Sequence, residues 1–138
     1  MRLRKVFEGL FVVFFIWVHF WLRMILVAHK STSFVCNEQG PFGIALPIII
    51  LLGLGCGIGI WLIFQWWQEA YFVYEWSWTF MIAGGLANLL ERAHFGCIMD
   101  YITVPYFPVF NIADILLTMG VLGIVIKSVK RKNKKDDV

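Results

Sequence analysis

The feature that most constrains this chain is a run of 22 residues, Gly43 to Phe64, in which no side chain carries a charge. About 20 consecutive apolar residues are enough for an α-helix to cross the hydrocarbon core of a bilayer. Pro47 falls near the start of this run, where a helix tolerates a missing amide donor. The run therefore predicts a transmembrane helix.

Apolar sequence continues over most of the chain. Of its 138 residues, 60% are hydrophobic and only 15% are charged, whereas charged residues make up roughly a quarter of a soluble domain. Further apolar stretches lie at 6–27, 72–90 and 109–126. We therefore expect an all-α integral membrane protein, with residues 1–138 forming a single domain of four transmembrane helices. A small extracytoplasmic element is expected between the first and second helices, with a strand or two near residues 33–36.

The first apolar stretch also resembles a secretory signal peptide, because basic residues precede it. No small-x-small cleavage site follows convincingly, and the stretch is long for a signal peptide. We interpret residues 6–27 as an uncleaved first transmembrane helix. His19, within this helix, is expected to be hydrogen-bonded inside the bundle.

The positions of the charges predict the orientation in the membrane. The net charge is +3, and most of the cationic residues lie at the two ends of the chain: Arg2, Arg4, Lys5, Lys127, Lys130, Arg131, Lys132, Lys134 and Lys135. Lys and Arg that flank membrane spans are retained on the cytoplasmic side, so both termini are expected in the cytoplasm. The aromatic segment from Gln65 to Trp78 is expected at the same boundary. We expect residues 127–138 to form a disordered basic tail that attracts anionic lipid headgroups, and we expect no nucleic-acid partner.

Small residues are expected to bring the helices close together. In the second span these are Gly53, Gly55, Gly57 and Gly59; in the third they are Gly84, Gly85 and Ala87. Small residues at helical spacing permit close approach of helices in lipid. A dinucleotide-binding loop is rejected, because the glycines do not follow the G-x-G-x-x-G spacing and no strand precedes them.

Two aspartates are the strongest candidates for chemistry. Asp100 lies in the connection between the third and fourth spans, and Asp114 lies at the mouth of the fourth. On the expected topology both are at the outer face, and ionisable residues at such positions usually mark a functional site. Two carboxyl groups held close together cannot both ionise readily, so one retains its proton. Such a pair supplies a general base for water and a general acid for a departing amine, without a fixed assignment of either role.

Polar neighbours accompany this pair. Asn111 lies one helical turn before Asp114 and can hydrogen-bond it or a substrate carbonyl. Asn88 and Arg92 are four residues apart and therefore share one helix face. The guanidinium fork of Arg92 suits peptide carbonyls or a carboxylate.

Other interpretations remain open for some of these residues. Asp114 at a helix start is also typical of a capping residue. His94, Cys97 and Asp100 are spaced at three-residue intervals and could bind a metal ion, although three mixed ligands without a second cluster are weak evidence. A disulfide between Cys36 and Cys97 is compatible with the topology, but we expect free thiols.

Four segments of this chain resemble motifs of signal peptidase II, the bacterial lipoprotein signal peptidase. The segments are P-V-F-N-I-A-D (Pro108 to Asp114), G-C-I-M-D-Y-I (Gly96 to Ile102), G-G-L-A-N-L-L-E-R (Gly84 to Arg92) and N-E-Q-G-P-F-G (Asn37 to Gly43). Their order and spacing, and the plan of four spans, agree with that family.

The resemblance implies an intramembrane aspartic endopeptidase without a cofactor or bound metal. It implies that Asp100 and Asp114 are catalytic, and that the substrate groove is lined by Asn37, Asn88, Arg92 and Asn111. The implied substrate is a diacylglyceryl-modified prolipoprotein, cut before its lipidated cysteine. We expect a monomer in the bacterial inner (plasma) membrane, in contact with membrane lipids, with its active site near the extracytoplasmic face.

The chain departs from the family pattern at several positions. His19 and Arg23 stand where the family usually has Asp and Lys, and Glu91 stands where it has Asp. Ala87 and Gln39 each replace a glycine. The chain is thus interpreted as a divergent member. The alternatives are a catalytically inactive four-helix membrane protein that binds lipidated peptides, or a small proton or ion carrier that uses Asp114.

Overall fold

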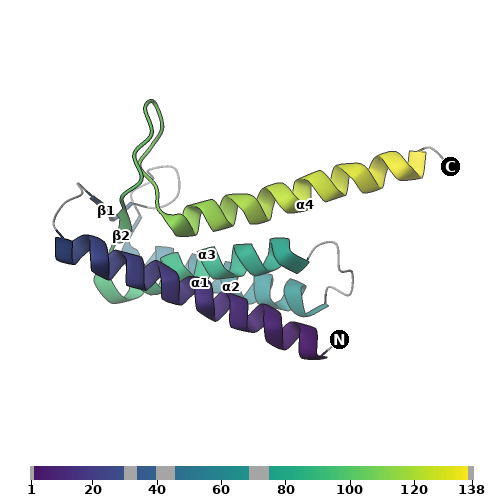
Figure 1. The fold of residues 1–138 in the computed structure, drawn as a ribbon, viewed down its shortest axis with the longest axis horizontal. Coiled ribbons are helices and arrows are strands. Elements are labelled where there is room, and N and C mark those ends of the chain that lie inside the picture. The colour runs from purple at the N-terminus through teal and green to yellow at the C-terminus, as the bar shows by residue number, and fades with distance from the viewer. Residues whose placement is uncertain (1, 30–33, 40–45, 69–74, 137–138) are drawn as a thin grey trace.

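The computed structural model describes residues 2–29, 34–39, 46–68 and 75–136. Within these ranges the chain forms four helices and two short strands: α1 (Arg2–His29), β1 (Val35–Asn37), α2 (Ile48–Gln68), α3 (Glu75–Phe95), β2 (Ile98–Asp100) and α4 (Ile112–Asp136). The strands lie at one end of the bundle, and the N-terminal end of α1 and the C-terminal end of α4 lie at the other (Figure 1). The expected mainly helical architecture is confirmed.

Helix α3 occupies the centre of the bundle, because it packs against α1, α2 and α4. Three helical segments of the described chain are long and apolar enough to cross a membrane: Leu3–His29, Ile48–Gln68 and Ile112–Lys130. Helix α3 is not among them, since it carries Asn88, Glu91 and Arg92. A helix enclosed by its neighbours does not need a lipid-compatible surface on every side, so polar residues are placed there at a lower energetic cost.

The closest helix contact is between α3 and α4, and glycines make it possible. A Cβ atom at Gly120 would lie 2.6 Å from the carbonyl oxygen of Ser77, and one at Gly84 would collide with the carbonyl oxygen of Ala113. This fits the packing role expected of Gly84. The expectation for α2 is wrong at three of its four glycines, because a Cβ at Gly53, Gly57 or Gly59 would meet no atom of the described residues within 4 Å. Gly55 of α2 is in close contact with Leu89.

The two strands form an antiparallel pair in which Val35 is opposite Asp100 and Cys36 is opposite Met99. A disulfide joins Cys36 to Cys97, the residue that precedes β2. The expectation of free thiols is therefore wrong for these two cysteines, while Cys56 is free. The physical reason is the strand pairing, which brings the two Cα atoms to 5.6 Å, within the range of disulfides.

The helix bounds refine the expected spans. Residues 6–27 lie inside α1, and α3 begins at Glu75 and continues to Phe95. The expected disorder of the tail is wrong over residues 127–136, since α4 continues to Asp136; Lys and Arg are good helix formers and let the helix run on. The start of the second span at 43–45, the start of the third at 72–74 and the aromatic residues Tyr71 and Tyr74 lie outside the described residues.

Candidate active site

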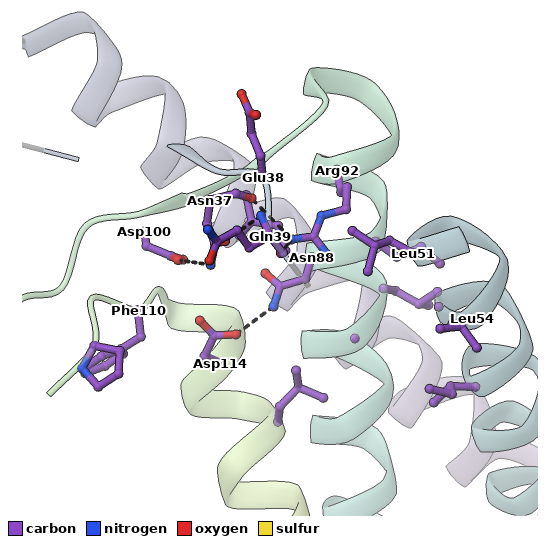
Figure 2. Close-up of a pocket in the computed structure, with 18 of the residues that line it drawn as sticks. Asn37, Glu38, Gln39, Leu51, Leu54, Asn88, Arg92, Asp100, Phe110 and Asp114 are labelled. Atoms are coloured by element: carbon purple, nitrogen blue, oxygen red, sulfur yellow. Dashed lines mark hydrogen bonds between the residues drawn. The ribbon is translucent and has the colours of Figure 1, made fainter. Parts of the chain in front are cut away.

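Asp100 ends strand β2 and is nearly buried, with 4% of its surface exposed. Its two carboxylate oxygens accept hydrogen bonds from two different asparagines. Asn37 Nδ2 in β1 donates to Oδ2 at 2.9 Å, and Asn111 Nδ2 donates to Oδ1 at 2.8 Å. The sheet and the start of α4 thus fix the orientation of this carboxyl group; Figure 2 shows the bond from Asn37.

Asp114 lies in the first turn of α4, and both of its oxygens also accept hydrogen bonds. Asn88 Nδ2 in α3 donates to Oδ1 at 2.8 Å, and the backbone N–H of Asn111 donates to Oδ2 at 3.1 Å. The Asn111 side chain therefore holds Asp100 while its backbone holds Asp114. One residue links the two carboxyl groups.

Asn111 is also the N-terminal cap of α4. Its Oδ1 accepts hydrogen bonds from the backbone N–H groups of Ala113 at 2.8 Å and Asp114 at 3.1 Å. The return bond from Asn111 N–H to the Asp114 carboxylate completes a reciprocal capping arrangement. The capping interpretation of Asp114 is thus correct for its Oδ2, while its Oδ1 is bound by α3.

The environment of Asp100 raises the pKa of its carboxyl group. Burial is the largest cause, because it disfavours the charged form. The hydrogen bonds from Asn37 and Asn111 oppose this effect by lowering the pKa, and the negative charges of Asp114 and Glu91 raise it further. Asp100 therefore keeps its proton to a higher pH than an exposed aspartate.

Arg92 holds the segment that follows β1. Its Nη2 donates to the carbonyl oxygen of Gln39 at 2.6 Å and to that of Asn37 at 3.3 Å. Gln39 N–H in turn donates to Asn37 Oδ1 at 3.1 Å. The guanidinium group thus positions the backbone of the residue whose side chain reaches Asp100.

Three of the departures from the family pattern lie in one buried cluster. Glu91, which is 0% exposed, is 2.8 Å from His19 Nε2 through Oε2 and accepts from Arg23 Nε at 2.7 Å through Oε1. The expected hydrogen bond of His19 inside the bundle is present. Glu91 Oε1 also accepts from the backbone N–H of Met99 at 3.2 Å, so α1 and α3 together hold the residue next to Asp100.

A cavity of about 1290 Å³ opens beside the carboxyl groups. It is lined at the sheet end by Asn37, Gln39, Asn88, Arg92, Asp100 and Asp114. Along α3 the lining then changes to Leu89, Leu86 and Ile82, and leucines of α2 lie on the opposite side from the carboxyl groups (Figure 2). Asn111 is buried and does not line the cavity. The cavity therefore has a polar end and an apolar end.

The metal-binding alternative loses one of its ligands, because the Cys97 sulfur is bonded to Cys36 and is not a free thiolate. A residue that sequence reasoning missed is Tyr101, whose Oη accepts from the backbone N–H of Ile112 at 3.2 Å. This bond ties the end of β2 to the start of α4. The position of Tyr101 directly after Asp100 was the sequence feature that could have indicated its role.

The model of the signal peptidase (SPase) II family matches residues 4–130, so this chain belongs to that family. The lipoprotein signal peptidase of Bartonella quintana (strain Toulouse) is 36% identical over 94 residues, which cover 63% of this chain and 52% of that protein. The lipoprotein signal peptidase of Lactococcus lactis subsp. lactis (strain IL1403) is 34% identical over 101 residues, which cover 72% and 62%. In both alignments this chain spans less than two thirds of the relative's length.

Two solved structures share the fold. Both are bacterial membrane enzymes determined by the in meso method, at 2.3 Å and 1.9 Å resolution. The first has a TM-score of 0.85 at 23% identity, covering 93% of this chain and 90% of that one. The second has a TM-score of 0.80 at 23% identity, covering 89% and 92%. At this identity the likeness concerns the fold alone.

Proposed function

We propose that this chain is an intramembrane aspartic endopeptidase that removes the signal peptide from diacylglyceryl-modified prolipoproteins, cutting before the lipidated cysteine. The observation that carries the proposal is the pair of carboxyl groups, Asp100 and Asp114, both hydrogen-bonded to Asn111 at the polar end of one cavity. Family membership and the names of the relatives support the same reaction.

The carboxyl pair supplies the two proton transfers that amide hydrolysis needs. The ionised carboxylate takes a proton from a water molecule, whose oxygen forms a bond with the carbonyl carbon of the scissile amide. The protonated carboxyl group gives its proton to the amide nitrogen as the C–N bond breaks. The products are a carboxyl terminus on the signal peptide and a free amine on the lipidated cysteine. The raised pKa of Asp100 supports a proton held at this pair.

The two-ended cavity suits a lipid-modified peptide. The polar end, with Asn37, Asn88 and Arg92, accommodates the peptide backbone, and the leucines of α2 and α3 accommodate acyl chains. Binding energy from the acyl chains is then available to hold the scissile amide against the carboxyl pair. Membrane lipids and the prolipoprotein are the proposed partners of a monomeric enzyme.

We place the active site near the extracytoplasmic face of the bacterial inner membrane, with four crossings and both termini in the cytoplasm. The basic residues at both ends of the sequence support this orientation. The arrangement in Figure 1 supports it as well, because the N-terminal end of α1 and the C-terminal end of α4 lie opposite the two strands and the start of α4. The segment around β1 is the proposed extracytoplasmic element.

The test compares purified full-length protein in detergent with its Asp100→Asn and Asp114→Asn variants, on a diacylglyceryl-modified prolipoprotein. Both variants are expected to cut at least about 100-fold more slowly, the size of one lost acid–base contribution. Asp136→Asn, at the far end of α4, is the matched control and is expected to cut at the native rate. The proposal is wrong if either site variant keeps the native rate. A native protein that binds this substrate without cutting it would favour the inactive alternative.

A further inference from the structure

The disulfide between Cys36 and Cys97 lies directly beside the candidate active site. Cys36 precedes Asn37, whose side chain donates to Asp100 at 2.9 Å. Cys97 precedes the strand that Asp100 ends. The covalent bond therefore joins the two strands within a few residues of the hydrogen bond between them.

Among the described residues, strand β1 is otherwise held by its pairing with β2 and by Arg92, and it is little buried. It is three residues long, its Val35 is 52% exposed, and Cys36 is exposed. Short exposed strands contribute little burial, and a single pair of strands is only marginally stable by itself. Besides its pairing with Ile98 of β2, Asn37 has polar contacts through its carbonyl with Arg92 and through its side-chain oxygen with Gln39.

The register of the strands determines which group meets Asp100. A slip of one residue would turn the Asn37 side chain to the opposite face of the sheet, since successive side chains in a strand alternate. The Cys36–Cys97 bond fixes this register covalently. The amide donor of Asn37 is then delivered to Asp100 Oδ2 without depending on the packing of β1.

We propose that the Cys36–Cys97 disulfide is a positioning element of the peptidase, which holds β1 so that Asn37 donates to Asp100. This inference rests on the function proposed above. Disulfides persist in extracytoplasmic, oxidising environments, which is where the proposed orientation places the sheet. Because Cys36 is exposed, a soluble dithiol can reach the bond. The dithiol transfers two electrons and two protons to the Cys36–Cys97 disulfide, which leaves two cysteine thiols and a cyclic disulfide of the reductant.

The test measures cleavage by full-length protein with the disulfide intact, after reduction by a dithiol, and in the Cys36→Ser/Cys97→Ser variant. Reduction and the double substitution are each expected to slow cleavage about tenfold or more, the size of one lost hydrogen bond to a charged group. The hydrogen bond from Asn37 favours the charged form of Asp100 and lowers its pKa. Its loss is therefore expected to move the limb of the pH–rate profile governed by Asp100 to higher pH.

An Asn37→Ala variant separates positioning from general stabilisation. If the disulfide acts through Asn37, reduction slows the native protein but has no additional effect on Asn37→Ala, and both show the same shifted pH profile. Equal slowing of native protein and Asn37→Ala by reduction would overturn the proposal, as would an unchanged rate and profile in the reduced native protein. Cys56→Ser, which changes the exposed free cysteine of α2, is the matched control and is expected to match the native rate.

A readout without substrate keeps this inference distinct from the proposed function. The Asp100 carboxyl group is titrated by carbon NMR on protein with labelled aspartate, with its signal identified from Asp100→Asn. The midpoint is expected at higher pH in the reduced than in the oxidised protein, whether or not either form cuts a prolipoprotein. An identical midpoint in both forms would show that the disulfide does not position Asn37.

Discussion

At the scale of residues, the site depends on groups that serve two partners at once. Asn111 caps α4 with its carbonyl oxygen and holds Asp100 with its amide nitrogen. Glu91 is hydrogen-bonded to His19 and Arg23 of α1 and accepts from the backbone N–H of Met99. Because each of these groups bonds to more than one element, no element can move without breaking a bond to another. The orientation of each carboxyl group therefore depends on several elements.

Glu91→Gln is expected to lower the free energy of unfolding by about 3–5 kcal/mol, because it leaves the largely buried Arg23 guanidinium without its partner. The measurement is thermal unfolding of the full chain in detergent. The double variant Glu91→Gln/Arg23→Gln removes the unpaired charge and is expected to recover part of the loss. A single variant as stable as the native protein, or a double variant less stable than the single one, would contradict the proposed role of the ion pair.

The sequence allowed Asp100, Asp114 and their asparagine neighbours to be predicted, because a carboxylate is conspicuous in apolar sequence. It did not allow the Glu91 cluster to be predicted. His19 and Arg23 are four residues apart and share a helix face, but their partner is 68 to 72 residues away. Helical periodicity shows which residues face inward, not which helix they meet.

At the scale of elements, α3 and α4 form the pair that carries the site. Asn88 of α3 reaches Asp114 of α4, and the glycine contacts lie along the same pair of helices. The spacing between the two helices therefore sets the distance between Asn88 and the carboxyl group that it binds. A change in helix packing away from the site is therefore expected to alter the distance between Asn88 and Asp114.

Gly120→Ala is expected to destabilise the protein by about 1–3 kcal/mol and to slow cleavage, because the new methyl group would meet backbone atoms of Ser77 and Met81 that cannot move aside. Thermal unfolding and the cleavage assay measure the two effects. Gly57→Ala in α2 is the matched control, since a Cβ there meets nothing within 4 Å. It is expected to be neutral or slightly stabilising, because Ala is the better helix former. Equal effects of the two substitutions would show that the contact between α3 and α4 is not tight.

The same glycines show where sequence reasoning stops. Small residues at helical spacing occur in both α2 and α3, and the spacing alone does not tell which stripe meets a neighbour. The strand pairing was equally hidden, because β1 and β2 have three residues each and the joined cysteines are 61 positions apart. Such short strands carry no periodicity of their own.

At the scale of the whole molecule, the helices form a shell around α3. The outward residues of α1, α2 and α4 are large and apolar, as expected for contact with lipid: examples are Trp17, Ile49, Ile60 and Val125. The polar residues of the site are instead gathered on α3, on the sheet and at the start of α4. Three of the four expected spans coincide with described helices that are long and apolar enough to cross a membrane, whereas a crossing by α3 stays a prediction.

The proposed orientation predicts which positions a membrane-impermeant maleimide labels in intact cells. Leu3→Cys and Lys130→Cys, placed in a Cys56→Ser background, are expected to react only after lysis, because the proposed orientation places both at the cytoplasmic end. Tyr106→Cys, in the exposed connection between β2 and α4, is expected to react before lysis and is the positive control. Labelling of either terminal position in intact cells would contradict four crossings with both termini inside.

In the proposed orientation, the unbroken helix α4 links the two surfaces of the membrane. Lys130 lies on the same helix as Asp114 and sixteen residues further on, about 24 Å along the axis at 1.5 Å per residue. The basic last turns of α4 would lie at the inner headgroups. They would then fix the depth of Asp114 relative to that surface. On the proposed function, the lipid tails of the prolipoprotein are instead anchored from the outer leaflet. The thickness of the bilayer would then determine whether the scissile amide lies at the same depth as the two carboxyl groups.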